Sequence, residues 1–302
     1  MFGLSFIWRG SAALVLLAVC LGSPLGAQAA KCGLTGTLDW ERMRIDAELS
    51  LDLSATGINF PAGRTQAEEA LFSEYFDSVL PLLLSIRLDS SSVIADLIAS
   101  AGLPISLVDA LARGAKRRPP RYSLDFSRIS SSYTIDLTDI GSRLAGHREA
   151  ARMDRLVGPV PVADYTGIIV IADGELPVHG RSVSAGLKPC LFPKIWDTEM
   201  NLIYDRSMTR PEWEAGFAMV RYTGVENIFR DNPSGLGDEL RRLVGERPLR
   251  VIARGVFGMN PTDPVIDRAD AVTILSSEAN RRLLVEGRVA FVVPSGALEE
   301  SF

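Results

Sequence analysis

The clearest pattern in the chain is a strict alternation of apolar and polar residues between Met43 and Leu53. Every odd position in this segment is apolar, and every even position is charged or carries a hydroxyl group. A period of two places successive side chains on opposite faces of a β-strand. The segment is therefore predicted to be a strand with one face on a core and one face in water.

A helical pattern follows this strand. Thr65 and Glu68 have the spacing of a capping box, in which each side chain accepts a hydrogen bond from a backbone N–H at the start of a helix. Apolar residues then recur at helical spacing between Phe72 and Leu83, so one face of the helix is predicted to be buried. Pro81 lacks an amide proton and is expected to end or kink this helix.

The remaining patterns predict two groups of elements on either side of a polar linker. Before the linker, two short helices are expected at residues 93–100 and 105–112, and strands at 122–126 and 133–137. After the linker, the expected elements are strands at 168–171, 217–221, 249–256 and 289–293, a hairpin at 187–204, and helices at 270–276 and 278–285.

These groups predict an α+β protein with two domains, each a mainly antiparallel sheet with helices packed on one face. The first domain is expected at residues 30–145 and the second at residues 164–302. Residues 146–163 lose the apolar alternation and include Gly158-Pro159-Val160-Pro161, which is typical of a linker.

The first 29 residues have the features of a secretory signal peptide. Arg9 is their only charge, the run from Ala12 to Leu21 is apolar, and Ala27-Gln28-Ala29 fits the small-x-small rule for cleavage. The apolar run is shorter than the roughly 20 residues that span a bilayer. We therefore expect export to the periplasm with cleavage after Ala29. The alternative is lipidation of Cys20, which would associate the chain with a membrane.

Composition narrows the possible function classes. The 302 residues carry 37 acidic and 32 basic side chains, a net charge of −5, and 47% of them are hydrophobic. These values are typical of globular domains, and the mild acidity argues against a nucleic-acid partner. After cleavage, Cys32 and Cys190 remain. A disulfide between them and two buried free thiols are both open at this stage.

The residues predict no catalytic, cofactor-binding or metal-ligating set. The chain contains no nucleophile elbow, no phosphate-binding loop, no dinucleotide fingerprint and no His or Cys pair at metal-ligand spacing. His179 near Ser182 is more typical of a surface turn than of a catalytic pair. Aromatic and charged side chains gather in and directly after the predicted hairpin, and Trp, Tyr and Arg are the types that interface hot spots favour. These candidate interaction residues are Lys194, Trp196, Tyr204 and Arg206.

The second half of the chain contains a set of short motifs at Tyr165-Thr166-Gly167, Leu187-Lys188-Pro189, Pro193-Lys194-Ile195, Asp197, Tyr204, Asp270-Ala271 and Val289–Val293. On these positions it resembles a bacterial envelope family that includes the flagellar basal-disk lipoprotein FlgP and relatives of the H-ring protein FlgT. The resemblance implies a non-enzymatic periplasmic or outer-membrane-associated protein that works with protein partners or copies of itself. An insertion between Pro211 and Leu249 and the poor fit of Cys20 to the family's lipid-bearing cysteine depart from the family.

We therefore expect a structural or assembly component of the envelope, associated with the flagellum if the resemblance extends to role. Exposed hairpin and sheet edges would contact the partners. The first alternative is a module that binds a cell-wall polymer through Lys116, Arg117 and Arg118. The second is a hydrolase that uses His179 or a pair of carboxylates brought together by the fold.

Overall fold

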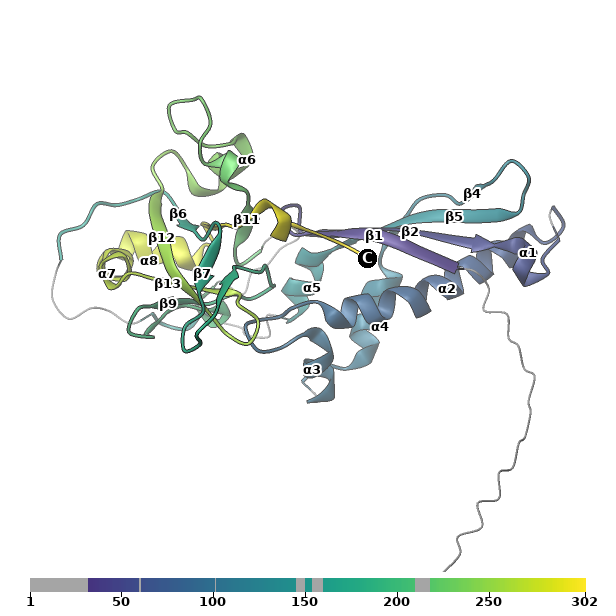
Figure 1. The fold of residues 1–302 in the computed structure, drawn as a ribbon, viewed down its shortest axis with the longest axis horizontal. Helices are drawn as coiled ribbons and strands as arrows, with labels where there is room; N and C mark the ends of the chain where they lie inside the picture. The colour runs from purple at the N-terminus through teal and green to yellow at the C-terminus, as the bar shows by residue number, and fades with distance from the viewer. Residues whose placement is uncertain (1–31, 60, 101, 145–149, 154–159, 210–217) are drawn as a thin grey trace, which may run out of the picture.

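The first domain is built on an antiparallel sheet that runs along the long axis of the molecule (Figure 1). The computed structural model describes residues 32–302 except 60, 101, 145–149, 154–159 and 210–217. The sheet has the order β15-β1-β2-β5-β3, and β4 also pairs with β5. Its strands are β1 (Cys32–Asp39), β2 (Arg44–Asp52), β3 (Lys116–Arg117), β4 (Arg121–Tyr122), β5 (Arg128–Asp136) and β15 (Glu299–Ser301).

The alternation in β2 determines which face of this sheet is buried. Ile45 and Leu49 are completely buried, whereas the even positions lie on the polar face. Helix α2 (Arg64–Ser85) covers the apolar face, and its Tyr75 stacks on Tyr133 of β5 with ring centroids 3.8 Å apart. The strand predicted at residues 43–53 is therefore confirmed.

The other helices of this domain are short. They are α1 (Leu53–Thr56), α3 (Ile94–Ala99), α4 (Ile105–Arg113) and α5 (Leu137–Leu144). The helices expected at 93–100 and 105–112 correspond to α3 and α4. The strand expected at 122–126 is mostly wrong, because β4 ends at Tyr122 and a turn follows.

Two expectations for α2, an end at Pro81 and a capping box, are wrong. The helix continues past Pro81 to Ser85, because Pro81 is exposed, while Val79 and Leu83 on the opposite face stay packed in the core. The capping box does not form, since the N-cap is Gly63. Glu68 instead accepts a hydrogen bond from Arg64 Nε at 3.0 Å and one from Tyr122 Oη at 3.0 Å.

The second domain contains a seven-stranded sheet in the order β10-β9-β13-β12-β6-β14-β11. The strands are β6 (Ile168–Ile171), β9 (Ile195–Asp197), β10 (Leu202–Tyr204), β11 (Arg221–Thr223), β12 (Leu249–Phe257), β13 (Asp263–Ile266) and β14 (Val289–Val292). A separate hairpin pairs β7 (Glu175–Pro177) with β8 (Ser184–Gly186). The helices are α6 (Asp238–Val244), α7 (Arg268–Ser276) and α8 (Glu278–Val285), with single turns η1 (Arg206–Met208), η2 (Val225–Asn227) and η3 (Ser295–Ala297).

The α+β class and the two domains are as expected, but the second sheet is mixed rather than mainly antiparallel. Strand β6 pairs in parallel with both β12 and β14, β14 with β11, and β13 with β9. Helices also cover both faces of this sheet. Helix α6 packs on the side of Ile169 and Val292, whereas α7 and α8 belong to the core on the opposite side. Apolar runs such as Ile168–Ile171 are therefore buried on both faces, which is typical of parallel strands.

The last strand does not belong to the sheet of the second domain. Strand β15 follows β14 in the chain but pairs with β1 in antiparallel fashion, with Thr37 opposite Ser301 and Asp39 opposite Glu299. Figure 1 shows this end of the chain lying over β1 in the middle of the molecule. Strand β15, within the range expected for the second domain, therefore belongs to the sheet of the first.

Several predictions fall on residues outside the described ranges. These are the signal peptide at residues 1–29 with Cys20, much of the linker, and Phe217. Phe217 was expected to start a strand at 217–221, but the observed strand β11 begins at Arg221. Within the described residues, no helix combines the length and the apolar character needed to cross a membrane.

Replacement of Pro81 tests the packing of α2. Proline at an exposed position inside a helix removes one backbone hydrogen bond. We expect Pro81→Ala to raise the free energy of unfolding by roughly 1–3 kcal/mol, measured by urea denaturation. Ser73→Ala, at another exposed position of α2, is the matched control and should change it by less than about 1 kcal/mol. A loss of stability in Pro81→Ala would show that the proline ring is needed for packing.

Candidate functional site at the domain junction

The segment between α2 and α3 extends from the first domain into the second. The backbone carbonyls of Arg87 and Leu88 accept hydrogen bonds from the N–H groups of Leu191 and Phe192, at 3.0 and 2.7 Å. The carbonyl of Ser90 accepts another from Asn260 N–H at 2.9 Å. Residues 86–93 are therefore hydrogen-bonded to two different loops of the second domain.

Arg87 is the side chain that joins the most parts of the junction. Its Nε donates to the carbonyl of Pro189 at 2.8 Å, and its guanidinium forms an ion pair with Glu300 next to β1. The guanidinium also lies over the ring of Trp40, 5.6 Å from its centroid. Trp40 Nε1 donates to Glu300 at 3.0 Å. Because hydrogen bonds to charged groups are stronger than neutral ones, this cluster fixes β15 against both domains.

A second buried cluster surrounds Asp263 in β13. Its carboxylate accepts hydrogen bonds from Lys194 N–H at 3.1 Å, Trp196 Nε1 at 3.2 Å and Thr262 Oγ1 at 3.0 Å. Ser90 of the first domain contributes a further hydrogen bond. Burial still raises the pKa of Asp263 above its usual value, because these donors only partly replace water. The carboxylate therefore connects the hairpin, β13 and the inserted segment.

Cys190 and Tyr222 lie beside this cluster and are both buried. Tyr222 Oη donates to the Cys190 carbonyl at 2.9 Å and accepts from the Cys190 N–H at 3.1 Å. Burial and the nearby charge of Asp263 raise the pKa of the Cys190 thiol, and burial also raises the pKa of Tyr222. Catalytic cysteines need the opposite shift, because the thiolate is the nucleophile. These groups are therefore held protonated, as in a structural cluster.

A cavity of about 200 Å³ lies next to Arg87 and is lined by residues that include Trp40, Ile86 and Phe302. Pockets for drug-sized ligands are larger, roughly 300–1,000 Å³. The polar groups at its wall, Arg87 and Glu300, already bind each other. The cavity is therefore smaller than a typical substrate site, and its two charged side chains are already paired with each other.

Other candidate chemistry is not brought together in the part of the chain that the structure describes. No three His, Cys, Asp or Glu side chains within it are grouped as a metal ion requires. His179 is exposed and lies 6.2 Å from the ring of Phe257, and no hydrogen bond joins it to Ser182 among the described residues. The geometry thus gives no support to a catalytic pair at His179.

The four hairpin residues expected at an interface lie in different environments. Tyr204 is completely buried, and its hydroxyl donates to the Met219 carbonyl at 3.1 Å, so the prediction of an exposed anchor is wrong there. Trp196 and Lys194 are half-buried against Asp263. Arg206 is exposed and lies over the ring of Phe192 at 5.4 Å. Hairpin periodicity alone did not show that β10 is covered by the segment around Met219.

The disulfide considered for Cys32 and Cys190 is not formed, and both thiols are free. Cys32 lies at the outer end of β1 beside α2, whereas Cys190 contacts Tyr222, which packs on Trp40 just beyond the other end of β1. An eight-residue strand is about 25 Å long, but bridged Cα atoms lie within about 7 Å. The two cysteines are therefore too far apart to pair.

The sequence analysis did not identify Arg87, Trp40, Glu300 or Asp263 as the centre of a site. Arg87 and Glu300 are 213 residues apart, and neither belongs to a motif. The sequence near Arg87 contains one local signal, the short polar run Asp89-Ser90-Ser91-Ser92. Such a run predicts a sharp turn in an exposed loop, so it gave no sign that the segment contacts a second domain.

Comparison with protein families gives two matches. Residues 31–143 match the family model for the N-terminal domain of Treponema pallidum Tp0624, and residues 167–295 match that for the second domain of the same protein. The chain is therefore similar to these two domains in the same order. A search of curated proteins found no match. Neither matched family concerns the basal-disk or H-ring proteins, so the flagellar resemblance stays a prediction.

The turn at Asp89 gives a prediction about pH. Asp89 Oδ1 accepts hydrogen bonds from the N–H and hydroxyl groups of Ser91 and Ser92, all at 2.9 Å. Burial opposes ionisation, but these bonds and the charge of Lys194 prevail, and the pKa of Asp89 is lower than its ordinary 3.8. A lowered folded-state pKa gives stability that is present above the unfolded value and is lost as pH falls through the folded value.

We therefore expect Asp89→Ala to lower the free energy of unfolding by roughly 1–3 kcal/mol at neutral pH. The difference from wild type should shrink as the pH falls below about 4. Urea denaturation across this range measures both effects. Asp77→Ala, at an exposed position of α2, is the control and should have little effect. A difference that grows in acid would contradict the assignment.

Thiol reactivity gives a second prediction. Burial, with a smaller contribution from the charge of Glu74, raises the pKa of Cys32 to about 11. Under native conditions Cys32 should react slowly with a maleimide, and the completely buried Cys190 should react only after denaturation. Peptide mass spectrometry after oxidation should find no Cys32–Cys190 bridge. Recovery of the bridged peptide from folded protein would disprove the arrangement of the two domains.

Proposed function

We propose that this chain is a non-enzymatic structural or assembly component of the bacterial envelope that acts in the periplasm or at the outer membrane. The sequence supports export through the leader at residues 1–29. The proposed role is to hold partner proteins, or copies of the chain, at a fixed spacing. The similarity to two Treponema pallidum domains indicates no activity.

The observation that carries the proposal is the exchange of segments across the junction. Residues 86–93 of the first domain are bonded to loops of the second, and β15, which follows the second domain, completes the sheet of the first. Domains joined by a single linker move relative to each other by default. Two segments that cross in opposite directions oppose such motion, so the molecule is expected to be a stiff elongated body.

The electrostatics of the junction also favour a structural role. Two-domain enzymes commonly bind substrates in a cleft that opens and closes between domains. In this protein the space between the domains is occupied by Trp40, Arg87 and Asp263 with their partners. Burial raises the pKa of the Cys190 thiol, which disfavours the thiolate that nucleophilic chemistry needs.

Cross-linking in the native cell tests this proposal. We expect the tagged full-length chain to cross-link to its own copies or to envelope proteins at a reproducible set of residue pairs, identified by mass spectrometry. Arg87→Ala with Glu300→Ala removes the ion pair of the junction and should disperse or abolish these pairs, because the spacing is no longer fixed.

The matched control is Arg113→Ala with Asp109→Ala, which removes an exposed ion pair of α4 and should leave the cross-links unchanged. A wild-type chain that stays monomeric and captures no envelope protein would refute the assembly role. Retention on purified cell wall in that case would favour the polymer-binding alternative.

A further inference from the structure

The turn between β4 and β5 presents two apolar side chains to solvent. Leu124 is completely exposed, at 102% of its reference area, and Phe126 is 49% exposed. Both follow Tyr122 at alternate positions, but the chain turns before they can join the sheet. Single exposed apolar residues are common on protein surfaces, whereas two at the tip of one hairpin form a protruding apolar point.

The backbone of this tip is held in one conformation. Phe126 N–H donates to the Ser123 carbonyl at 3.0 Å, and Phe126 has a φ of 56°, which a non-glycine residue rarely adopts. Asp125 accepts from Ser123 Oγ at 2.6 Å and from Ser127 N–H at 3.2 Å. These bonds lower the pKa of Asp125 to about 2. The Asp125 carboxylate is therefore bonded within the turn, and Leu124 beside it is fully exposed.

Basic residues surround the tip. Residues 113–128 contain five arginines and one lysine but only one acidic residue, Asp125. Arg113 and Lys116 are paired with Asp109 and Asp136. Within the described residues, the exposed guanidinium groups of Arg118, Arg121 and Arg128 make no ion pair, so their charge is available to an anionic surface.

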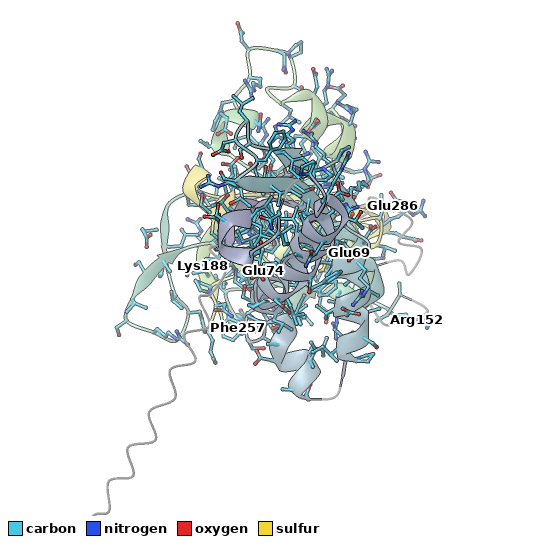
Figure 2. The ribbon with its side chains drawn as sticks, turned by 90° about the vertical axis from the view of Figure 1, so that its right-hand side faces the viewer. Glu69, Glu74, Arg152, Lys188, Phe257 and Glu286 are labelled. Atoms are coloured by element: carbon cyan, nitrogen blue, oxygen red, sulfur yellow. The ribbon has the colours of Figure 1, made fainter. Side chains whose placement is uncertain are left out.

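The first described residue, Cys32, lies at the same end of the molecule as the tip. Cys32 of β1 lies opposite Leu51, Leu51 lies opposite Ile129, and Ile129 lies opposite Tyr122, so one row across the sheet links the start of β1 to the tip. In Figure 1 the tip and α1 lie together at the right, and Figure 2 shows the molecule from this end. The chain before Cys32 includes the apolar run Ala12–Leu21.

We propose that the Ser123–Ser127 tip with its flanking arginines is a docking site for an anionic lipid bilayer. Leu124 and Phe126 enter the boundary between headgroups and acyl chains, while Arg121 and Arg128 on either side contact lipid phosphates. An exposed apolar wedge gains free energy in a bilayer but not on a hydrated polymer. Cys32 lies at this same end, so under the alternative in which Cys20 is lipidated the anchored chain would bring the tip to the membrane.

A tryptophan placed at the tip tests the proposal directly. Full-length Leu124→Trp is mixed with vesicles of phosphatidylcholine and phosphatidylglycerol, and the added emission is recorded with and without brominated lipids. We expect a shift to shorter wavelength and quenching by the brominated lipids. The control Ile252→Trp is at an exposed site of β12 in the other domain and should show neither change. This readout reports on the tip even if the leader itself enters the bilayer.

Removal of the Arg121 and Arg128 charges tests whether the tip prefers anionic to neutral lipids. In Leu124→Trp, the further changes Arg121→Gln and Arg128→Gln should each weaken insertion of the tip by roughly fivefold. Vesicles of phosphatidylcholine alone should give little quenching. Unshifted emission of Trp at position 124 on vesicle-bound protein, or equal quenching on neutral and anionic vesicles, would overturn the proposal. Unshifted emission together with binding to purified cell wall would assign the basic residues to a polymer instead. Circular dichroism confirms that each variant is folded.

Discussion

The arrangement of the molecule depends on how one half-buried arginine is bonded between its two domains. A guanidinium removed from water is stable only when acceptors surround it. Arg87 obtains them from the Pro189 carbonyl in the second domain and from Glu300 beside β1, and Trp40 covers its face. No single domain supplies this set. The full set of Arg87 contacts therefore requires both domains and β15 to be in place, and it fixes their relative position.

The local features of the fold could be predicted from the sequence, and the pairing between distant elements could not. Alternation identified β2, and helical spacing identified α8. Pro81 was misjudged because tertiary packing on Val79 and Leu83 outweighs a missing hydrogen bond. The parallel pairing of β6 with β12 and β14 depends on which neighbours meet, and an apolar run such as Ile168–Ile171 is compatible with either direction.

The candidate site was harder to predict than the fold for the same reason. Interface chemistry favours Trp, Tyr and Arg, but residue type does not distinguish an exposed Tyr204 from a buried one. The sequence also could not show that Asp263 meets Ser90 or that Arg87 meets Glu300, because each pair joins separate segments. By contrast, Tyr122, Leu124 and Phe126 alternate as in a strand, but the chain turns after Tyr122 and leaves Leu124 exposed. This exposed position belongs to the surface that we infer to contact lipid.

The position of β15 has a consequence for the order in which the protein folds. Trp40 and Glu300 are hydrogen-bonded although they are 260 residues apart. The sheet that begins at β1 therefore lacks its edge strand until almost the whole chain has been synthesised and the second domain has formed. Closure of such a long loop is slow, because its entropy must be lost before the contact stabilises it. Until β15 has paired, the edge of β1 keeps free backbone groups, so it is open to pairing with a strand of another chain.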